Sequence, residues 1–569
     1  MGRRREGVQM SRQRGWRRAG VSIDLIKQSM TSPRAYAVLW SLVLAGMGSM
    51  LGCRTPAGSA GARLEVRVVD DATGAPLAAR VAVTNSDGKF VEIDGKHAHV
   101  QYLGKRWCYV DGSFTLAVPA SGAEIEIRRG LETLPLSATI SGDTSGKAIQ
   151  KTYRLRRWID MCRKGYVNGD IHAHLPVPRE AHPQMRAEDL NALVLLYLPD
   201  PDNPIATNKC FTGRMDAGST PGCEIYVGQE VQEWQMGHLN MIGLTKLIDG
   251  YPRAGGTLEY WKSLPQWDLI RAMRAVREQN GTVIWPHMSS LPGAELPIGL
   301  SLGLVDAVEL MTWNDPTQLP NHWGPWLNSG MSQAEFPVLR GVDLYYQFLN
   351  AGFRLPIAAG TDKLGEEIPL GSNRVYAKVQ GPATYEAWLA AVKAGKAFVT
   401  NGPILEFEAG DAGAGDVVEF QGAKRIEARA TARSILPFTT LEIIFNGDAV
   451  GHKTIPVWKN EPKDGLYSME VEATIELARS GWLAARVVDH PDLKNRILPR
   501  DLSVFAHTDP IYFLQDGRKV REEASVVYLR KYVQGVRHWL GTEPTFANEQ
   551  DRREAQRAAE EALRFYESL

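Results

Sequence analysis

A change in hydrophobic patterning near Gly165 separates two kinds of structure in this chain. Before it, from Ala62 to about Trp158, short segments alternate apolar and polar side chains, which is the period of half-buried strands. After it, continuous apolar runs alternate with segments of helical periodicity, a pattern typical of buried parallel strands joined by helices. The sequence therefore predicts a small β-sandwich over residues 62–160 and an α/β domain over residues 161–402.

The α/β segment contains six apolar runs that predict buried strands. They occupy residues 192–198, 223–230, 238–244, 282–287, 306–313 and 355–362. Apolar side chains recur at helical spacing in two of the intervening segments, at Trp267, Ile270, Met273 and Val276 and at Leu339, Val342, Tyr346 and Leu349.

The C-terminal part of the chain returns to alternating patterns. Residues 403–510 contain four such runs, separated by Asn-Gly and Ser-Gly turns, and predict a second domain that resembles a β-sandwich. Residues 511–569 form a last segment that ends in a helix from about Glu543. Its buried stripe is expected to consist of Ala555, Ala559, Ala562 and Tyr566.

The N-terminus has the features of an export signal. Eight basic residues within the first thirty precede Ala35–Leu51, a run of 17 residues without a charge. An apolar run of this length with basic residues upstream and small residues at its end is typical of a secretory signal, whereas a membrane-spanning helix needs about 20 residues. Leu51-Gly52-Cys53 is similar to a bacterial lipobox, although Met50 stands where Leu is usual.

We therefore expect a leader over residues 1–53, lipidated at Cys53, and a short linker over residues 54–61. This predicts an exported protein, either a cell-envelope lipoprotein or a periplasmic or secreted protein, whose only membrane contact is an N-terminal lipid anchor. A buried N-terminal core segment is the structural alternative. Met30 is an alternative start that would leave Arg34 as the basic region.

The charge balance restricts the partners. The chain carries 65 Lys and Arg against 65 Asp and Glu, so it lacks the basic excess that neutralises nucleic-acid phosphates. We expect a small-molecule substrate and no nucleic-acid partner, and the sequence leaves the oligomeric state open.

The cysteines allow two interpretations. Lipidation of Cys53 would leave four others, Cys108, Cys162, Cys210 and Cys223, an even number that is compatible with disulfides in an oxidising compartment. Cys210 and Cys223 flank a loop that a disulfide could close. Alternatively, all four are free thiols.

Six of the twelve histidines lie in the predicted α/β domain, and two of them form an H-x-H motif. His172 and His174 lie in GDIHAH, at the expected end of the first strand of this domain. Residues i and i+2 of a strand face the same side, about 6 to 7 Å apart along the chain, so two imidazoles can approach one metal ion.

Other metal-ligand types occur where further predicted strands begin or end. Glu230, His287 and Asp362 end their strands, and His238 opens one. Imidazole and carboxylate together suit zinc, manganese or iron, and a carboxylate such as Glu230 could bridge two ions. The sequence thus predicts one or two divalent ions held by His172, His174, Glu230, His238, His287 and Asp362.

Each of these residues also has a purely structural interpretation, since a histidine can be a bonded core residue and an aspartate can cap a turn. His182, in the polar segment EAHPQ, is expected at the surface. His322 and Trp313 lie in or beside a Trp-rich loop that either lines a substrate pocket or packs as an ordinary loop. Neither a GxSxG motif nor a phosphate-binding Gly-rich loop before a helix is present.

GDIHAH, the GQE and GH pair eight residues apart, the Pro-His pair and AAGTD together resemble the metal-dependent hydrolases of the PHP (polymerase and histidinol phosphatase) family. Within it, RRWIDMCRKGYVNGDIHAH, the preceding β region and FVTNGPILEF are similar to the carbaryl hydrolase-like branch, the CehA/McbA family. The resemblance covers nearly everything after the leader. It implies a distorted (β/α)7 barrel with a metal centre at its mouth, flanked by two β domains, and His172, His174, Glu230, His238, His287 and Asp362 match the ligand motifs.

Two family motifs are absent. The Thr-Asp-His after the second strand is replaced by Pro199-Asp200, and Asp362 is followed by Lys363 and Leu364 instead of completing Asp-x-His. The resemblance therefore implies one or two ions rather than three.

The predicted function is that of an exported metal-dependent hydrolase that cleaves an ester, carbamate, amide or phosphoester bond with metal-activated water. Asp362 is the candidate proton acceptor. The alternatives are a non-catalytic envelope protein whose β domains bind glycans or protein partners, and a member of the amidohydrolase superfamily, which also begins with H-x-H.

Overall fold

The computed structural model describes residues 63–142, 148–198, 205–233, 235–251, 265–290, 292–312, 314–320, 337–490, 498, 502–542 and 545–569. The predicted leader, with its lipidation site Cys53, and the linker lie outside these residues.

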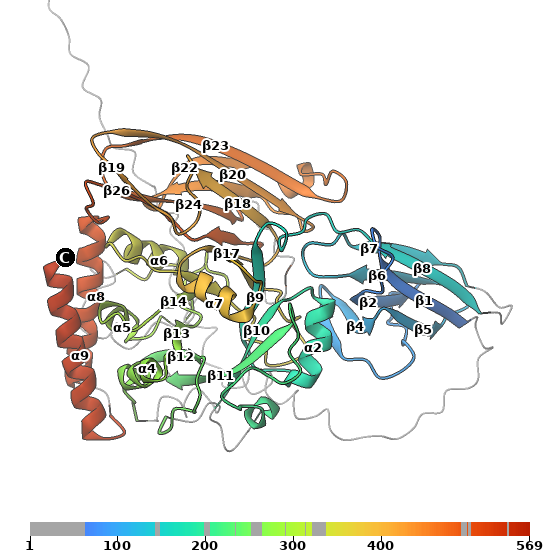
Figure 1. Ribbon diagram of the computed structural model, residues 1–569, viewed down its shortest axis with the longest axis horizontal. Coiled ribbons are helices and arrows are strands. Elements are labelled where there is room, and N and C mark those ends of the chain that lie inside the picture. Colours follow the sequence, from blue (N-terminus) through green and yellow to red (C-terminus); the bar gives the residue numbers. More distant parts are fainter. Residues whose placement is uncertain are drawn as a thin grey trace, which may run out of the picture. The chain divides into compact units, whose positions relative to one another are not determined.

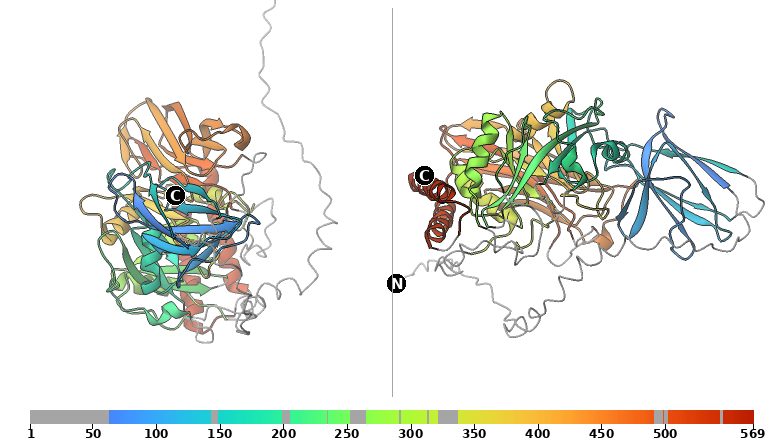
Figure 2. Two further views of the ribbon diagram at one scale, coloured as in Figure 1. Left: turned by 90° about the vertical axis from the view of Figure 1, so that its right-hand side faces the viewer. Right: turned by 90° about the horizontal axis from the view of Figure 1, so that it is seen from below.

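The N-terminal β region consists of two facing sheets (Figures 1 and 2). One has the order β5-β1-β8 and the other β3-β4-β2-β6-β7. The strands are β1 (Arg63–Asp70), β2 (Ala78–Asn85), β3 (His99–Tyr102), β4 (Lys105–Asp111), β5 (Ser113–Ala117), β6 (Ala123–Arg128), β7 (Leu136–Ile140) and β8 (Ile149–Leu155). Alternate side chains of both sheets, such as Val66, Val81 and Leu116, form a shared apolar core. A β-sandwich is therefore present in this part of the chain.

Strand β2 is buried on both of its faces. Ala79, Val81 and Val83 point into the sandwich core, while Ala78, Arg80 and Ala82 on the other face are also buried. Helix α2 (Pro178–Ala187) packs against this second face. An alternating sequence predicts only one buried face, so the contact with α2 was not evident from the sequence.

The α/β part contains seven strands that neighbour one another in chain order, among the residues that the structure describes. They are β9 (Tyr166–Ala173), β10 (Ala192–Tyr197), β11 (Glu224–Glu233), β12 (Gly237–Ile242), β13 (Thr282–Trp285), β14 (Ala307–Met311) and β15 (Ile357–Ala359). β10 to β15 overlap the six predicted runs, β9 is the first strand expected before the H-x-H motif, and the mixed α/β class is confirmed.

The prediction of parallel pairing is wrong at one strand. β12 runs antiparallel to both β11 and β13. The connection from Glu233 to Gly237 is too short for a crossover helix, so the chain forms a hairpin at this point. As a result the beginning of β12 lies at the same edge as the carboxyl end of β11.

The segment after β15 returns to β9. Asp362 N donates to His172 O at 2.8 Å, and Ala173 and Lys363 form a parallel bridge. Gly360 permits this approach, since a Cβ atom there would lie 2.4 Å from the Cβ of His172. The first and last of the seven strands are therefore joined at their carboxyl ends.

Seven α-helices are found in the described residues, and most of them cover the α/β sheet (Figure 1). Besides α2 they are α4 (Leu269–Glu278), α5 (Leu296–Ser301), α6 (Gly341–Asn350), α7 (Tyr385–Lys393), α8 (Glu523–Thr542) and α9 (Glu549–Ser568). The two C-terminal helices pack together and against α4, α5 and α6. The predicted stripe of α9 is confirmed, because Ala555, Ala559, Ala562 and Tyr566 are all fully buried.

The C-terminal β region continues the sheet of the α/β part. β9 also pairs with β16 (Arg374–Lys378), and the sheet continues through β17 (Ala397–Thr400) and β25 (Ala506–Thr508) to β24 (Gly481–Val488). The remaining strands are β18 (Ile404–Ala409), β19 (Val417–Phe420), β20 (Lys424–Ser434), β21 (Thr440–Phe445), β22 (Asp448–Thr454), β23 (Tyr467–Leu477) and β26 (Ile511–Gln515). β18, β20 and β23 form a separate sheet that shares an apolar core with this extension.

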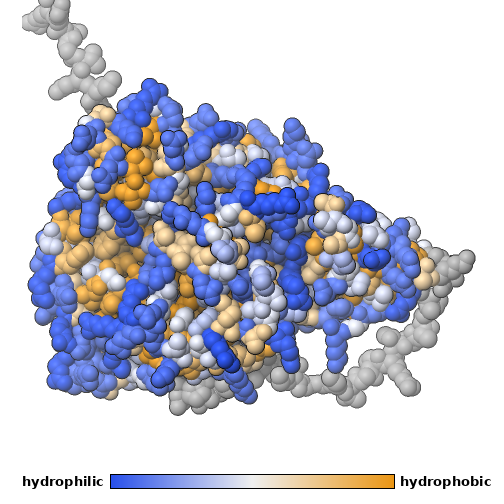
Figure 3. Space-filling view, viewed as in Figure 1, coloured by the Kyte–Doolittle hydropathy of each residue, from blue (hydrophilic) through white to orange (hydrophobic). Residues whose placement is uncertain are grey.

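The face of the molecule shown in Figure 3 is mainly polar, with scattered apolar areas. Among the described residues, no helix combines the length and apolar character needed to cross a bilayer. Cys108, Cys162, Cys210 and Cys223 are free thiols, so the disulfide considered between Cys210 and Cys223 is not formed.

Candidate metal centre

The H-x-H motif lies at the end of β9, as the sequence predicts: His172 is in the strand and His174 directly follows it. His172 and His174 are fully buried, and their Nε2 atoms are 3.2 Å apart. Asp362 comes from the segment after β15, and its Oδ1 lies 3.3 Å from Nε2 of His172 and 3.2 Å from Nε2 of His174. Ligand atoms around a tetrahedral zinc ion, with bonds of about 2.0–2.1 Å, are about 3.4 Å apart. The three atoms thus fit a single ion.

A second group of three lies beside the first. Nδ1 of His238 is 3.2 Å from Oε1 of Glu230 and 3.2 Å from Nε2 of His287. His287 Nε2 is 3.6 Å from the same Glu230 oxygen. Strand β11 continues three residues past Glu230, to Glu233, so Glu230 lies inside the strand and not at its end as the sequence predicts. The β11–β12 hairpin brings His238, near the beginning of β12, beside this part of β11. All six predicted ligands therefore lie in two groups that could each hold a metal ion.

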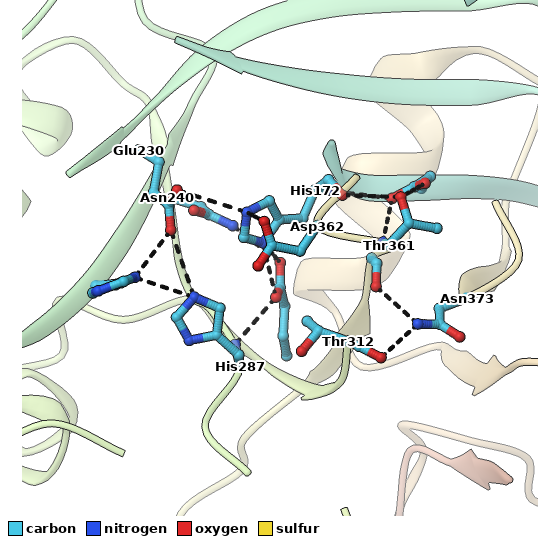
Figure 4. Close-up of polar contacts among 12 residues, drawn as sticks. His172, Glu230, Asn240, His287, Thr312, Thr361, Asp362 and Asn373 are labelled. Atoms are coloured by element: carbon cyan, nitrogen blue, oxygen red, sulfur yellow. Dashed lines mark hydrogen bonds and ion pairs between the residues drawn. The ribbon is translucent and has the colours of Figure 1, made fainter. Parts of the chain in front are cut away.

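Glu230 belongs to both groups (Figure 4). Its Oε1 faces His238 and His287, while its Oε2 is 3.2 Å from Nε2 of His174 and 3.8 Å from Nε2 of His172. A carboxylate that divides its two oxygens in this way has the geometry of a bridge between two ions.

Hydrogen bonds behind the ligands fix their orientation. Nδ1 of His172 lies 3.1 Å from each carboxylate oxygen of Glu309, and Nδ1 of His174 lies 3.2 Å from Leu196 O. These acceptors hold a proton on Nδ1, so Nε2 is the nitrogen that each ring presents to a metal. Glu309 also accepts from Asn240 Nδ2 at 3.0 Å and from the backbone N–H of His287 at 3.1 Å.

The sequence reasoning missed Glu309. It lies inside β14 and is fully buried. The available signal was a carboxylate in the middle of the apolar run AVELM, where a charge is costly unless it is paired.

The backbone is held in uncommon conformations at two ligands. His287 has φ +32° and Asp362 has φ +47°, in the left-handed region that residues other than glycine seldom adopt. The turn at Asp362 is held by Asp170, whose Oδ1 accepts from the N–H groups of His172 and Thr361 at 3.2 and 3.0 Å. Its Oδ2 accepts from Thr361 Oγ1 at 2.7 Å. Asp170 thus ties together the segments that carry His172 and Asp362.

The electrostatics show a site with closely balanced charges. Burial disfavours the charged forms, but the carboxylates of Glu309, Asp362 and Glu230 outweigh it and hold the pKa of His172 well above its ordinary value. Hydrogen bonds to Asp362 and Glu230 likewise overcome burial and raise the pKa of His174 to about 9. The same histidines hold the pKa values of Glu230 and Asp362 well below theirs. A bound cation would take the place of these protons, so the donor set suits a metal ion.

Two of the six side chains are slightly exposed to solvent. Of the six side chains, those of Asp362 and His238 are 11% and 12% exposed, whereas the others are almost fully buried. The candidate substrate residues Trp313 and His322 lie outside the described residues.

The prediction that His182 lies at the surface is wrong. Its Nε2 is 2.9 Å from Asp216 Oδ2, and its Nδ1 is 3.6 Å from Sγ of Cys223. Helix α2 turns this face toward the start of β11 and buries the ring. Burial raises the pKa of the Cys223 thiol, so this arrangement keeps a neutral thiol and is no activated nucleophile.

Comparison of the chain with models of known protein families and with curated proteins returns no match.

Proposed function

We propose that this protein is an exported hydrolase that depends on divalent metal ions and belongs to the PHP type, in its carbaryl hydrolase-like branch. The observation that supports it best is the position of Glu230, which shares its two oxygens between two ligand groups. Pairs of ions joined by a carboxylate are typical of metallohydrolases.

The arrangement of strands supports a distorted (β/α)7 barrel as the fold of this part. β9 to β15 follow one another in order, and the segment after β15 returns to β9. The ligands lie at the edge where most of these strands end, which is where barrel enzymes carry their active sites.

Each residue has a proposed role. His172, His174 and Asp362 would hold one ion and His238 and His287 a second, and Glu230, with one oxygen toward each group, would complete both sets of ligands. When bound, such ions lower the pKa of water toward neutrality and polarise the bond to be cleaved. Asp362 is the candidate proton acceptor, because it is one of the two ligands that reach solvent. Zinc, manganese and iron all suit nitrogen and oxygen ligands.

Export is proposed from the N-terminal sequence, with a lipid anchor at Cys53 as its preferred form. The bond that is cleaved is an ester, carbamate, amide or phosphoester.

The test begins with elemental analysis of protein purified without added metal. The protein is then assayed with p-nitrophenyl phosphates, esters and carbamates, with and without manganese or zinc. We expect His172→Ala to abolish turnover of the preferred class. His452→Ala, which alters an exposed histidine on β22, is the matched control and should keep full activity.

Equal rates for wild type and His172→Ala on every substrate class would refute the hydrolase proposal. Ligand binding without metal and without turnover would instead favour a non-catalytic envelope protein.

A further inference from the structure

The N-terminal β-sandwich contacts the α/β part through a buried charge. Arg80 on β2 is 7% exposed and lies over the rings of Tyr102 and Trp107, at 4.9 and 5.4 Å from their centroids. Its Nη1 is 2.9 Å from Oε1 of Glu188, which also accepts from Tyr109 Oη at 3.0 Å. Glu188 is the C-cap residue that follows helix α2. A buried ion pair therefore joins the sandwich to the end of this helix.

The turn after α2 is held by the sandwich a second time. Asp189 has φ +53°, and its carboxylate accepts from Arg129 at 2.5 Å and from Arg157 at 2.6 Å. The turn Glu188–Asp189 thus has its side chains fixed by three arginines from outside the α/β part.

The backbone of this turn is bound by Arg374, a buried residue of β16. Its Nη2 donates to Glu188 O at 3.1 Å, and its Nε donates to Gly371 O at 2.5 Å. Gly371 N in turn donates to Asp170 Oδ2 at 2.9 Å. Asp170 is the carboxylate that ties the His172 segment to the Asp362 segment.

We infer that Arg80 is a positioning residue for the metal group formed by His172, His174 and Asp362. This inference rests on the proposed function. The buried Arg80–Glu188 pair fixes the end of α2. Arg374 binds the carbonyl groups of Glu188 and Gly371, and the N–H of Gly371 binds Asp170, so the position of this turn affects the position of Asp170. Asp170 in turn holds together the segments of His172 and Asp362, which come from opposite ends of the domain. Asp170 binds the His172 and Thr361 segments directly, whereas Glu230 and Glu309 link the group of Glu230, His238 and His287 to His172 and His174, so the effect of Arg80 should be greater on the ion of the His172 group.

The experiment compares Arg80→Met with Arg128→Met in the full chain. Arg128 lies on β6, has its guanidinium 5.6 Å from the same Trp107 ring and pairs with Glu126, but it makes no described contact with α2. Metal-free protein is titrated with Co²⁺ alone and followed by absorption and by heat. Arg80→Met should weaken binding of one ion by about 2- to 30-fold, the range found for changes along a connected chain of contacts that does not touch the ligand itself. Arg128→Met should bind both ions as the wild type does.

The weakened site is assigned in a His238→Ala background, where only the His172 group keeps all its ligands. Adding Arg80→Met to this background should weaken the remaining ion by the same factor. Arg80→Lys keeps the charge but loses the planar fork, and should weaken the same ion by a smaller factor. If thermal melting shows that Arg80→Met does not fold, the comparison is made with Arg80→Lys instead.

Unchanged affinity for both ions in the Arg80 variants would overturn the inference. So would equal weakening of both ions, or an equal effect of Arg128→Met, since either would indicate general destabilisation. If the wild type itself binds no ion, the proposed function is refuted. If the wild type binds two ions and the Arg80 variants bind them equally well, only the inference about Arg80 is refuted.

Discussion

Glu309 lies directly behind His172, with both of its carboxylate oxygens 3.1 Å from Nδ1 of that ring. The carboxylate fixes the orientation and the tautomer of a ligand without belonging to either ligand group.

Glu309→Gln should therefore weaken metal binding while leaving all six ligands in place. Its amide oxygen can still accept from Nδ1, but the charge that makes His172 a stronger ligand is lost. We expect affinity for one ion to fall by about 10- to 100-fold in a metal titration. Glu408→Gln, at an exposed position, is the control and should bind as the wild type does.

Gly360→Ala tests the close approach of β15 to β9. A Cβ atom would lie 2.4 Å from Cβ and 2.7 Å from the backbone N of His172. Such overpacking typically costs about 1–3 kcal/mol, and here it also displaces a ligand. We expect a lower melting temperature and weaker metal binding.

Gly541→Ala is the matched control, because a Cβ atom there meets nothing within 4 Å. An unchanged melting temperature for Gly360→Ala would show that the two strands are farther apart than described.

Glu233, at the end of β11, should make stability fall as pH rises. Burial, only partly offset by the N–H groups of Gln235 and Met236, raises its pKa from an ordinary 4.5 to about 8. Between these values the folded chain keeps a proton that the unfolded chain releases. The contribution of Glu233 to stability is thus complete below pH 4.5. As the pH rises to about 8, the free energy of unfolding falls by at most about 5 kcal/mol.

Glu233→Gln mimics the protonated acid, so its gain in melting temperature over wild type should grow from pH 5 to pH 8.5. Glu124→Gln, at an exposed position on β6, should show no such trend. A constant difference between Glu233→Gln and wild type across this range would argue against a protonated Glu233.

Removal of metal should destabilise the protein. Ions that bind only the folded chain contribute about 2.7 kcal/mol when present at 100 times their dissociation constant. We expect a chelator to lower the melting temperature of wild type and to have a smaller effect on Glu230→Gln, which lacks the charged carboxylate between the two groups but keeps His172, His174 and Asp362. Equal effects of the chelator on both proteins would contradict the shared role of Glu230.

The ligand set could be predicted because chemistry and strand position coincide in the sequence. Glu230, His287 and Asp362 each stand at the end of a predicted run and His172 at the expected end of the first strand, and parallel strands bring such positions to one edge. His238 begins its run instead, and only the hairpin from Glu233 to Gly237 explains why it reaches the same place.

Other parts of the site depend on tertiary contacts that no local pattern encodes. The alternating pattern of β2 makes Arg80 an outward-facing polar residue, yet α2 covers it. Its partner Glu188 is 108 residues away in the sequence, so no local pattern predicts this contact. His182 was assigned to the surface for the same reason, since the polar segment around it says nothing about Asp216. Burial by a distant segment is what single-sequence patterns cannot show.

The position of β16 between β9 and β17 has a consequence for how the chain can be divided. The strand that carries the H-x-H motif and the strands that lead into the C-terminal β region belong to a single hydrogen-bonded sheet. A fragment ending near residue 402 would leave β17 without its partner β25 and expose a bare edge prone to aggregation. Scanning calorimetry should accordingly show strands β9 to β15 and the C-terminal strands melting in one shared transition.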